Sequence, residues 1–534
     1  MKRLTRINIM KKINLLKLSL SNLESSKLKL TELKLTELKL TELKLTELKL
    51  TELKLTEIKL TELKTTKFEA PKLSLLALNL CIALAGFTNS AQAEEPVAEV
   101  YTFMDSIKDG KNLTSFRLRY ELVDQDGLAV APVANQELKK GEALTLCSLV
   151  GWQTAPYNNF SFTGQLIGVT KFMDNYNDRK GNATEINKAD YATIVDPNHF
   201  DVNQLYVNWT GIKNTRFRLG RQQVNLDNVR FIGDIGFRQV MQVFDGVSVL
   251  NKSIPDTEVF LAHFEQVTQI TTKQRDGDLE IANVKYRISP TEFLVGYGYF
   301  SNMDDLGFGN AWFGAGSLNN NGKPNLTADQ SNKIFGLRLD GVHPFNPNLR
   351  ALYTAEYAKQ TDYADGDKRI DAHYYKLGGG VGIDNFSVRI DQELLSSNNS
   401  KYAFQTPLGT NHLFQGGVDR FLVTPRQGIQ NTFVTVTYKY ADILFFADYH
   451  VLKSDEDFNT VGGGTKTNGD TYGTGWNVAA TYNWNKNIMT KFEYGKHNEE
   501  DKYAATANVP NTIAGNRGRI RDIEKLWLTA MYTF

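Results

Sequence analysis

Residues 115–122 read Ser-Phe-Arg-Leu-Arg-Tyr-Glu-Leu, so an apolar residue stands at every second position with a polar one between. A period of two is the period of a β-strand, whose successive side chains point to opposite faces of a sheet. The same alternation recurs at residues 335–340 and 386–391, and the final segment, residues 525–534, ends on an aromatic residue, Phe534. These segments predict strands that each have one apolar face.

Eighteen segments of this kind follow one another along the chain. They begin near residues 115, 143, 160, 200, 215, 244, 257, 279, 292, 333, 349, 373, 386, 431, 443, 475, 488 and 523. Short links alternate with long ones, the short including 211–214, 289–291, 382–385 and 441–442 and the long including 170–199, 222–243, 301–332, 394–430 and 497–522. One rim of short turns and one rim of long loops is typical of an outer-membrane barrel.

We therefore predict an all-β fold, a transmembrane antiparallel β-barrel of about 18 strands over residues 115–534, with short periplasmic turns and long external loops. A soluble sandwich or propeller is the alternative, but neither has a reason to alternate short and long links.

An export signal precedes the predicted barrel. The apolar stretch 73–87 follows Lys64, Lys67 and Lys72 and is followed by Ala91-Gln92-Ala93, which are the charged, apolar and small-residue parts of a signal peptide. We expect a signal peptide over residues 67–93, cleavage after Ala93, and an N-terminal lead-in over residues 94–114. No other stretch approaches the roughly 18 to 20 apolar residues that a membrane-spanning helix requires.

Residues 1–66 form a low-complexity extension ahead of this signal. Within it, residues 29–63 are seven tandem copies of Lys-Leu-Thr-Glu-Leu, the sixth ending in Ile58. A five-residue period rotates by about 140° per copy on a helix, so the leucines build no lasting apolar face. The structured alternative, a pentapeptide-repeat solenoid, needs more copies to bury a core.

Composition and motifs exclude several classes of function. After Ala93 the chain has 44 basic and 51 acidic residues, a net charge of −7, which does not indicate a nucleic-acid binder. The sequence has no Gly-x-Ser-x-Gly, no His-Glu-x-x-His and no phosphate-binding loop, and its seven histidines are scattered. We expect no enzyme activity and no cofactor. Cys147, the one cysteine after the signal, is expected to be a small buried residue.

Three blocks of sequence are more specific than strand alternation. The first lies within residues 201–250 and includes Gly220-Arg221-Gln222-Gln223 and Phe237-Arg238-Gln239; the second is residues 410–421, Thr-Asn-His-Leu-Phe-Gln-Gly-Gly-Val-Asp-Arg-Phe; the third is the closing pair of hairpins. In this order they resemble the alginate-export family of outer-membrane porins over residues 113–534. The resemblance implies an eighteen-stranded barrel with a polar lumen. The chain departs from the family pattern at Leu413, where lysine is common, and at Gly417, where an aromatic residue is common.

Alternation also assigns charged side chains to the lumen, because they stand opposite the apolar, lipid-facing positions. The strands place 12 basic and 8 acidic residues there, and such a basic surplus favours anionic solutes. The alternative is that Arg–Glu and Lys–Asp pairs neutralise one another across strands. Candidate pore-constriction and solute-binding residues are Arg221, Arg230, Arg238, Arg117, Arg119, Arg216, Arg218, Arg338 and Arg389.

Three of these arginines, Arg221, Arg230 and Arg238, lie in the link 222–243 or at its edge. The link is rich in apolar residues, so we expect it to fold into the barrel and narrow it. In the second block, His412 and Asp419 are candidates for a structural loop hydrogen bond or for solute contact.

These observations predict a passive porin of the bacterial outer membrane for small or chain-like, anionic solutes. The alternatives are a dedicated exporter of alginate or another exopolysaccharide and a non-conducting structural or adhesive barrel. The expected partners are outer-membrane lipid and lipopolysaccharide, an anionic solute or polysaccharide, and the barrel assembly machinery, which would bind the C-terminal strand ending in Phe534.

Overall fold

The computed structural model describes residues 101–127, 137–180, 188–306, 328–457, 469–500 and 522–534, all within one compact unit, Ala70–Phe534. The predicted N-terminal extension, the predicted signal peptide and residues 94–100 of the lead-in lie outside the described residues.

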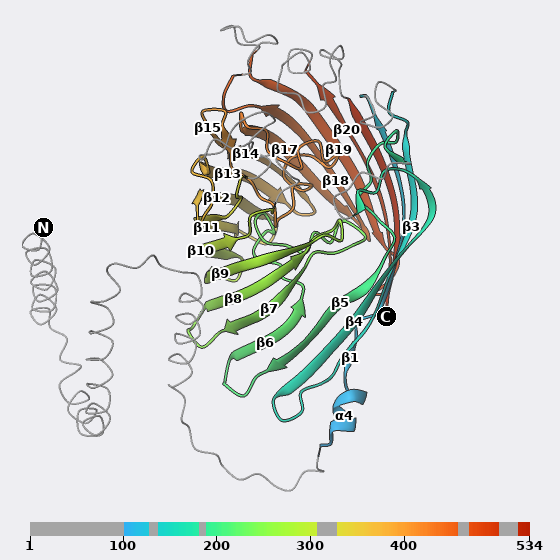
Figure 1. Ribbon diagram of the computed structural model, residues 1–534, viewed down its shortest axis with the longest axis vertical. Helices are drawn as coiled ribbons and strands as arrows, with labels where there is room; N and C mark the ends of the chain where they lie inside the picture. Colours follow the sequence, from blue (N-terminus) through green and yellow to red (C-terminus); the bar gives the residue numbers. More distant parts are fainter. Residues whose placement is uncertain (1–100, 128–136, 181–187, 307–327, 458–468, 501–521) are drawn as a thin grey trace, which may run out of the picture. The chain divides into compact units, whose positions relative to one another are not determined.

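Eighteen antiparallel strands form a closed barrel (Figure 1). Each strand pairs with the next along the chain, and β21 closes the barrel on β2 in a register that runs from Ser115↔Thr533 to Gln125↔Ile523. The predicted fold class is confirmed. The barrel strands are β2 Ser115–Gln125, β3 Gly141–Gln153, β4 Phe160–Asn175, β5 His199–Trp209, β6 Thr215–Gln222, β7 Val243–Asn251, β8 Thr257–Thr268, β9 Gln274–Ser289, β10 Glu292–Asn302, β11 Asn332–Pro344, β12 Leu349–Asp362, β13 Asp371–Ile383, β14 Phe386–Leu395, β17 Ile429–Tyr440, β18 Ile443–Lys453, β19 Thr471–Asn483, β20 Ile488–Glu499 and β21 Ile523–Thr533.

Four shorter elements accompany the barrel strands. Helix α4, Phe103–Lys108, and β1, Lys111–Asn112, precede β2, and β1 pairs with the end of β3. Strands β15, Ser397–Asn398, and β16, Tyr402–Ala403, form a small hairpin after β14. No helix in the described part of the chain is long and apolar enough to cross a membrane.

The observed strands begin close to the predicted positions. The largest differences are at β9, which begins at Gln274 rather than near residue 279, and at β19, which begins at Thr471 rather than near residue 475. The extra residues of β9 are Gln-Arg-Asp-Gly-Asp, which carry no apolar alternation because they lie at the strand end next to a connection. Hydrogen-bonded strands therefore extend beyond the segment whose alternation marks the lipid-facing belt.

The two rims differ as predicted. The connections 210–214, 290–291, 345–348, 384–385 and 441–442 are short, whereas 176–198, 223–242, 303–331, 396–428 and 500–522 are long. Asp384 and Ala441, in the two-residue turns, have φ of 47° and 49°, the positive values that tight hairpin turns require. Because short turns face the periplasm in such barrels, this rim is the periplasmic one.

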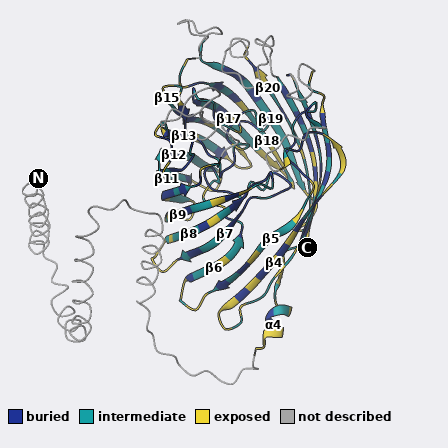
Figure 2. Ribbon diagram, in the orientation of Figure 1, coloured by how far each residue is buried: buried dark blue, intermediate teal, exposed yellow. Residues whose placement is uncertain are grey.

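The two faces of the wall have different chemistry. Leu118, Leu337 and Leu377 are 41%, 56% and 54% exposed, whereas Arg119 and Glu121, at alternate positions of β2, are buried. Figure 2 shows buried and exposed residues alternating along the strands. Cys147 is 2% exposed, as expected of a small buried residue. An apolar outer band faces lipid and a largely polar inner face does not.

The lumen is not polar throughout. Buried apolar side chains form a cluster between β8–β14 and the two long connections 223–242 and 396–428; its aromatic members include Phe231, Tyr297, Tyr374 and Phe404. Part of the barrel interior therefore resembles the core of a soluble domain, with loops packed on a sheet.

Candidate functional site

Two long connections fold into the barrel and touch each other there. The backbone N–H of Gly233 donates to Leu408 O at 2.9 Å, and that of Thr410 donates to Val229 O at 3.0 Å. A side chain at Gly409 would place its Cβ 2.0 Å from Arg230 O, so only glycine permits this approach. We call residues 223–242 and 404–428 together the lumen insert. The link 222–243 enters the barrel as expected, since it also binds Arg117 of β2 and Glu393 of β14 on the inner face of the wall. That it narrows the passage stays a prediction.

On one side the lumen insert packs by aromatic contact. The Phe231 ring centroid lies 5.2 Å from that of Tyr374, 5.5 Å from that of Tyr297 and 5.8 Å from that of Phe404. These rings are almost fully buried. Tilted and edge-on ring pairs of this kind add to the stabilisation that burial supplies.

Arg230 lies next to this aromatic cluster and is paired. Its Nε donates to Glu393 Oε1 of β14 at 2.8 Å and its Nη2 to Oε2 at 3.2 Å, and neither side chain is exposed. Its Nη1 donates to Asn411 Oδ1 at 2.6 Å and to Thr410 O at 3.3 Å. The guanidinium therefore joins both parts of the lumen insert to the wall, in the bidentate geometry that arginine forms with a carboxylate.

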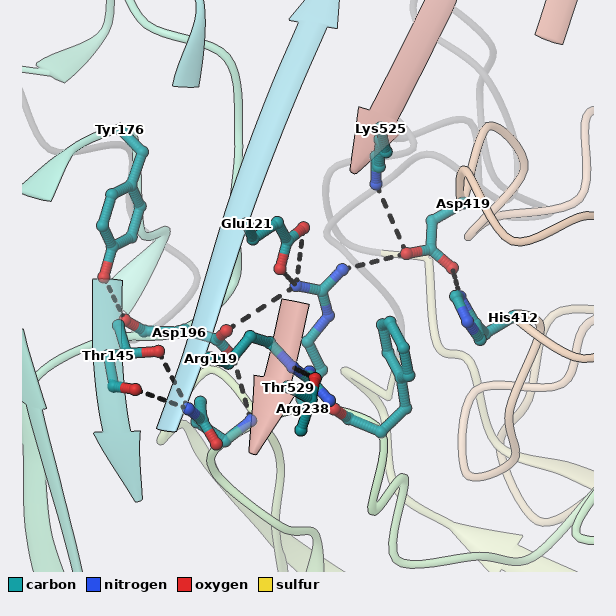
Figure 3. Close-up of polar contacts among 12 residues, drawn as sticks. Arg119, Glu121, Thr145, Tyr176, Asp196, Arg238, His412, Asp419, Lys525 and Thr529 are labelled. Atoms are coloured by element: carbon teal, nitrogen blue, oxygen red, sulfur yellow. Dashed lines mark hydrogen bonds and ion pairs between the residues drawn. The ribbon is translucent and has the colours of Figure 1, made fainter. Parts of the chain in front are cut away.

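The part of the lumen insert around Arg238 is held by ion pairs (Figure 3). Arg238 Nη1 lies 3.0 Å from Glu121 Oε2 of β2 and 3.9 Å from Asp196 Oδ2 of the connection 176–198. Its Nη2 donates to Asp419 Oδ2 at 2.9 Å. One guanidinium thus lies among three carboxylates that come from the wall and from two different loops.

Besides Arg238, two further side chains contact the Asp419 carboxylate. His412 Nδ1 lies 2.9 Å from Asp419 Oδ1, and Lys525 Nζ of β21 donates to Oδ2 at 3.4 Å. Burial by itself raises the pKa of Asp419, but the charges of His412, Lys525 and Arg238 outweigh burial and hold the pKa well below its usual range. Burial raises the pKa of Asp196 above its usual range, because its attraction to Arg238 does not compensate for the lost hydration.

Arg117 and Arg119 of β2 bind the tip of the lumen insert through its backbone. Arg117 donates to Gly236 O at 2.6 Å and to the carbonyl of Arg238, and Arg119 donates to the carbonyl of Phe237. The guanidinium carbon of Arg119 also lies 4.6 Å from the centre of the Phe237 ring. Both arginines thus bind the protein itself rather than line an open passage.

Three further candidates pair with neighbouring carboxylates. Arg221 Nε donates to Asp245 at 2.8 Å, Arg338 Nη2 lies 2.8 Å from Asp340, and Arg389 Nη2 lies 2.6 Å from Asp391. A guanidinium that is neutralised in this way contributes little field to a passing ion.

Arg216 and Arg218 are different, because neither forms an ion pair with any described residue. With Lys285 of β9 they line a cavity of about 280 Å³, which we call the basic cavity. Residues 222–227 of β6 and the lumen insert also line it. Both arginines lie near the start of β6, towards the short-turn rim, so the basic cavity is on the periplasmic side of the lumen insert.

Sequence reasoning missed several residues of this site. Asp196, Asn411 and Gln239 lie in loops, where alternation gives no information about direction, and each binds an arginine or its neighbour. The two positions that depart from the family pattern also lie in the lumen insert: Leu413 is 64% exposed, and the N–H of Gly417 donates to Asn477 Oδ1 at 3.0 Å. The described residues contain no group of three or more side chains placed to bind a metal ion.

Comparison with known proteins agrees with this architecture. Residues 157–409 match the family described as alginate export. No curated protein sequence matches the chain significantly. The predicted resemblance is confirmed over residues 157–409, which contain the first block, whereas the second and third blocks lie outside the matched range. A family of export proteins agrees with the expectation that the chain is not an enzyme.

Several solved structures of bacterial proteins share this fold. OccAB4 of Acinetobacter baumannii is 10% identical, with a TM-score of 0.54 over 79% of this chain and 98% of that one. OpdL of Pseudomonas aeruginosa is 12% identical, with a TM-score of 0.52 over 79% and 99%. The outer membrane protein OpdK of P. aeruginosa is 11% identical, with a TM-score of 0.53 over 80% and 100%. The chain therefore has the same closed β-barrel fold as these proteins, which is consistent with a place in the bacterial outer membrane.

Proposed function

We propose that this outer-membrane barrel, whose residues 157–409 belong to the alginate export family, is a passive porin that conducts small or chain-like anionic solutes past the lumen insert. The fold and the family support the channel. The preference for anions rests on one observation, the unpaired cations of the basic cavity.

The cations of the basic cavity form no ion pair with a described residue, and their close contacts are with neutral groups. Arg218 Nε donates to Asn208 Oδ1 at 2.8 Å and its guanidinium lies 3.8 Å from the centre of the Tyr206 ring. Arg216 Nε is a buried donor without a hydrogen-bond acceptor among the described residues. Lys285 Nζ lies 4.3 Å from the centre of the Phe293 ring. Unused donors beside aromatic faces are suited to bind a carboxylate.

The two carboxylates of the basic cavity do not cancel these charges. Glu258 pairs with Lys252 at 2.8 Å. Asp227 accepts a hydrogen bond from Asn283 at 2.7 Å. The basic cavity therefore keeps a positive charge, because three cations line it and Asp227 is the one lining carboxylate among the described residues that is not paired with a lysine. A unit charge about 4 Å from a passing ion is worth about 1 to 4 kcal/mol before screening by salt.

Two kinds of anion fit this site. The structure of OpdK has been determined with vanillate, a small aromatic carboxylate, and the ring of Phe260, which lines the basic cavity, is compatible with such a solute. The family description points instead to a chain-like uronate. A channel for small anions and an exporter of an anionic polysaccharide share this carboxylate chemistry and differ in the length of the solute.

Planar-bilayer recording of the purified protein tests the proposal. In a KCl gradient we expect the wild type to prefer chloride, with a preference that fades as the Debye length falls from about 10 Å at 0.1 M to about 3 Å at 1 M. Replacing Arg216, Arg218 and Lys285 together by Gln should move the reversal potential towards that of a cation-selective pore. It should also weaken block by an oligouronate or vanillate.

The matched control is Arg287→Gln. Arg287 is on the same strand as Lys285, but it is exposed and pairs with Asp256, so its removal should leave the reversal potential unchanged. A wild type that does not conduct at any voltage would support the non-conducting barrel instead. A triple variant that folds and keeps the wild-type reversal potential would contradict the role of the basic cavity. Stronger block by longer oligouronates than by vanillate would favour the exporter.

A further inference from the structure

Helix α4 lies outside the barrel, at its periplasmic rim. The helix precedes β1, which pairs with Trp152 and Gln153 at the end of β3, and the connection 154–159 that follows β3 is one of the short turns (Figure 1). Phe103 of the helix lies edge-on to Phe162 of β4, with 6.4 Å between ring centroids. Phe162 is 46% exposed and alternates with buried Ser161 and Thr163, so it belongs to the outward face.

The helix is attached to the wall by specific contacts rather than only by the chain. Trp152 Nε1 donates to Ile107 O at 2.8 Å, and the N–H of Ala155 donates to Ser106 O at 2.8 Å. A Cβ at Gly110 would lie 2.2 Å from Trp152 Nε1, so glycine permits the chain to cross this indole. Ser106 is fully buried against the turn. The position of α4 on the barrel is therefore fixed.

The attachment leaves part of the apolar surface of this segment exposed in the described part of the chain. Tyr101, Phe103 and Met104 are 42%, 46% and 59% exposed. Phe103, Met104 and Ile107 fall within about 100° of arc on a helix with 3.6 residues per turn. Through Phe103 this surface adjoins Phe162, which faces outward on β4.

The polar groups of α4 agree with a location at a membrane surface. Asp105 is used to cap the helix: it accepts from the N–H of Thr102 at 2.9 Å, and the N–H of Asp105 donates to Thr102 Oγ1 at 3.2 Å. Lys108, at the other end, has a side chain that is 71% exposed. An exposed lysine stem beside an apolar surface can extend its ammonium group to lipid phosphates. Aromatic residues are concentrated at the same level of barrels that cross membranes.

We propose that Tyr101 and α4 form an interfacial anchor that inserts into the headgroup region of the phospholipid leaflet on the periplasmic side. The partner is a lipid surface rather than a protein, because the apolar surface of α4 adjoins the wall that already faces lipid. A short interfacial helix of this kind fixes the depth at which the periplasmic rim lies in the bilayer. The proposal does not depend on which solute the barrel conducts.

A single label tests this location. In a background with Cys81→Ala and Cys147→Ala, which removes both cysteines of the chain, Met104→Cys is labelled with an environment-sensitive NBD fluorophore. The barrel is then reconstituted into protein-free phosphatidylcholine–phosphatidylglycerol vesicles. We expect a blue-shifted emission that is quenched by phospholipids carrying a nitroxide on the headgroup or on the upper acyl chain. Iodide in the water phase should quench this label weakly.

The matched control is Lys486→Cys in the same background. Lys486 is an exposed residue of the short turn 484–487 on the same rim, and its label should show water-like emission and strong quenching by iodide. The inference is overturned if the label at position 104 behaves like the label at position 486. Emission of the label at position 104 that stays water-like in vesicles and shifts only when a periplasmic protein is added would equally overturn it, because the partner would then be a protein.

Discussion

The connection 223–242 is bound to the barrel in two different ways at its two ends. Around Phe231 it is buried among aromatic rings, and the one charge there, Arg230, is paired with Glu393 where no solvent reaches either side chain. Around Arg238 it is bound by an ionic cluster that reaches Glu121, Asp196 and Asp419. The first region joins the loop to β9–β14 and the second joins it to β2 and β21.

The difference shows which part of the lumen insert is permanent and which responds to conditions. Aromatic packing excludes water and depends little on pH or salt. A cluster of charges gains or loses free energy when any member changes its protonation, so its strength depends on pH. We therefore expect the aromatic region to set the stability of the barrel and the ionic region to set its response to acid.

The largest loss of unfolding free energy is expected from Phe231→Ala. Removing a buried Phe leaves a cavity and costs about 4 kcal/mol of unfolding free energy, and the loosened loop should also raise the conductance. Urea unfolding of the barrel in lipid vesicles measures the first effect and planar-bilayer recording the second. Phe200→Ala is the control, since Phe200 is 77% exposed and its loss should cost far less. Equal costs for the two variants would contradict a permanent aromatic region.

The next effect is expected from Glu393→Gln. It leaves the guanidinium of Arg230 in a buried site without an opposite charge, which should cost about 3 kcal/mol. Replacing both partners by Met should recover most of this loss, because no charge then remains buried. The control is Asp256→Asn, which removes a half-exposed partner of Arg287 and should cost less than about 1 kcal/mol. If the double variant is as unstable as the single one, the unpaired charge of Arg230 is not the cause of the destabilisation.

The smallest changes in unfolding free energy are expected for two carboxylates of the ionic region, Asp419 and Asp196, which should respond to pH in opposite ways. The pKa of Asp419 is lowered in the fold, so its stabilisation is fully present above the unfolded value of about 4 and is lost as the pH falls below it. Asp419→Asn should cost about 2 kcal/mol at pH 7, and its difference from wild type should shrink below about pH 4. The pKa of Asp196 is raised, so ionisation of Asp196 weakens the fold as the pH rises above about 4.

Asp196→Asn is therefore the matched partner of Asp419→Asn. It keeps the Oδ1 acceptor for the N–H of Gln239 and should not lower the unfolding free energy at pH 7. Urea titrations of both variants at pH 3.5 and pH 7 make the comparison. A loss for Asp196→Asn as large as that for Asp419→Asn would show that the two carboxylates act alike.

The sequence by itself determined the wall of this protein. The alternation at residues 115–122 places Arg117, Arg119 and Glu121 inside and Leu118 outside, and the structure agrees. Strand position, strand face and the two kinds of rim follow from the sequence because the side-chain period of a strand and the residues of a tight turn are local properties. The family resemblance likewise rests on residue offsets within single blocks.

Only the tertiary structure decided which charges are free. Arg230 and Glu393 are 163 residues apart, and Arg238 and Asp419 are 181 apart, so no local pattern connects them. Their meeting depends on the closure of the barrel and on the path of two loops that have no period. Nine arginines look equivalent in the sequence. Arg338 and Arg389 are paired locally, each with an aspartate two residues along its own strand. Five others meet partners on other strands or loops, and Arg216 and Arg218 are left facing the basic cavity. A side chain's charge is local, whereas its partner is set by long-range packing.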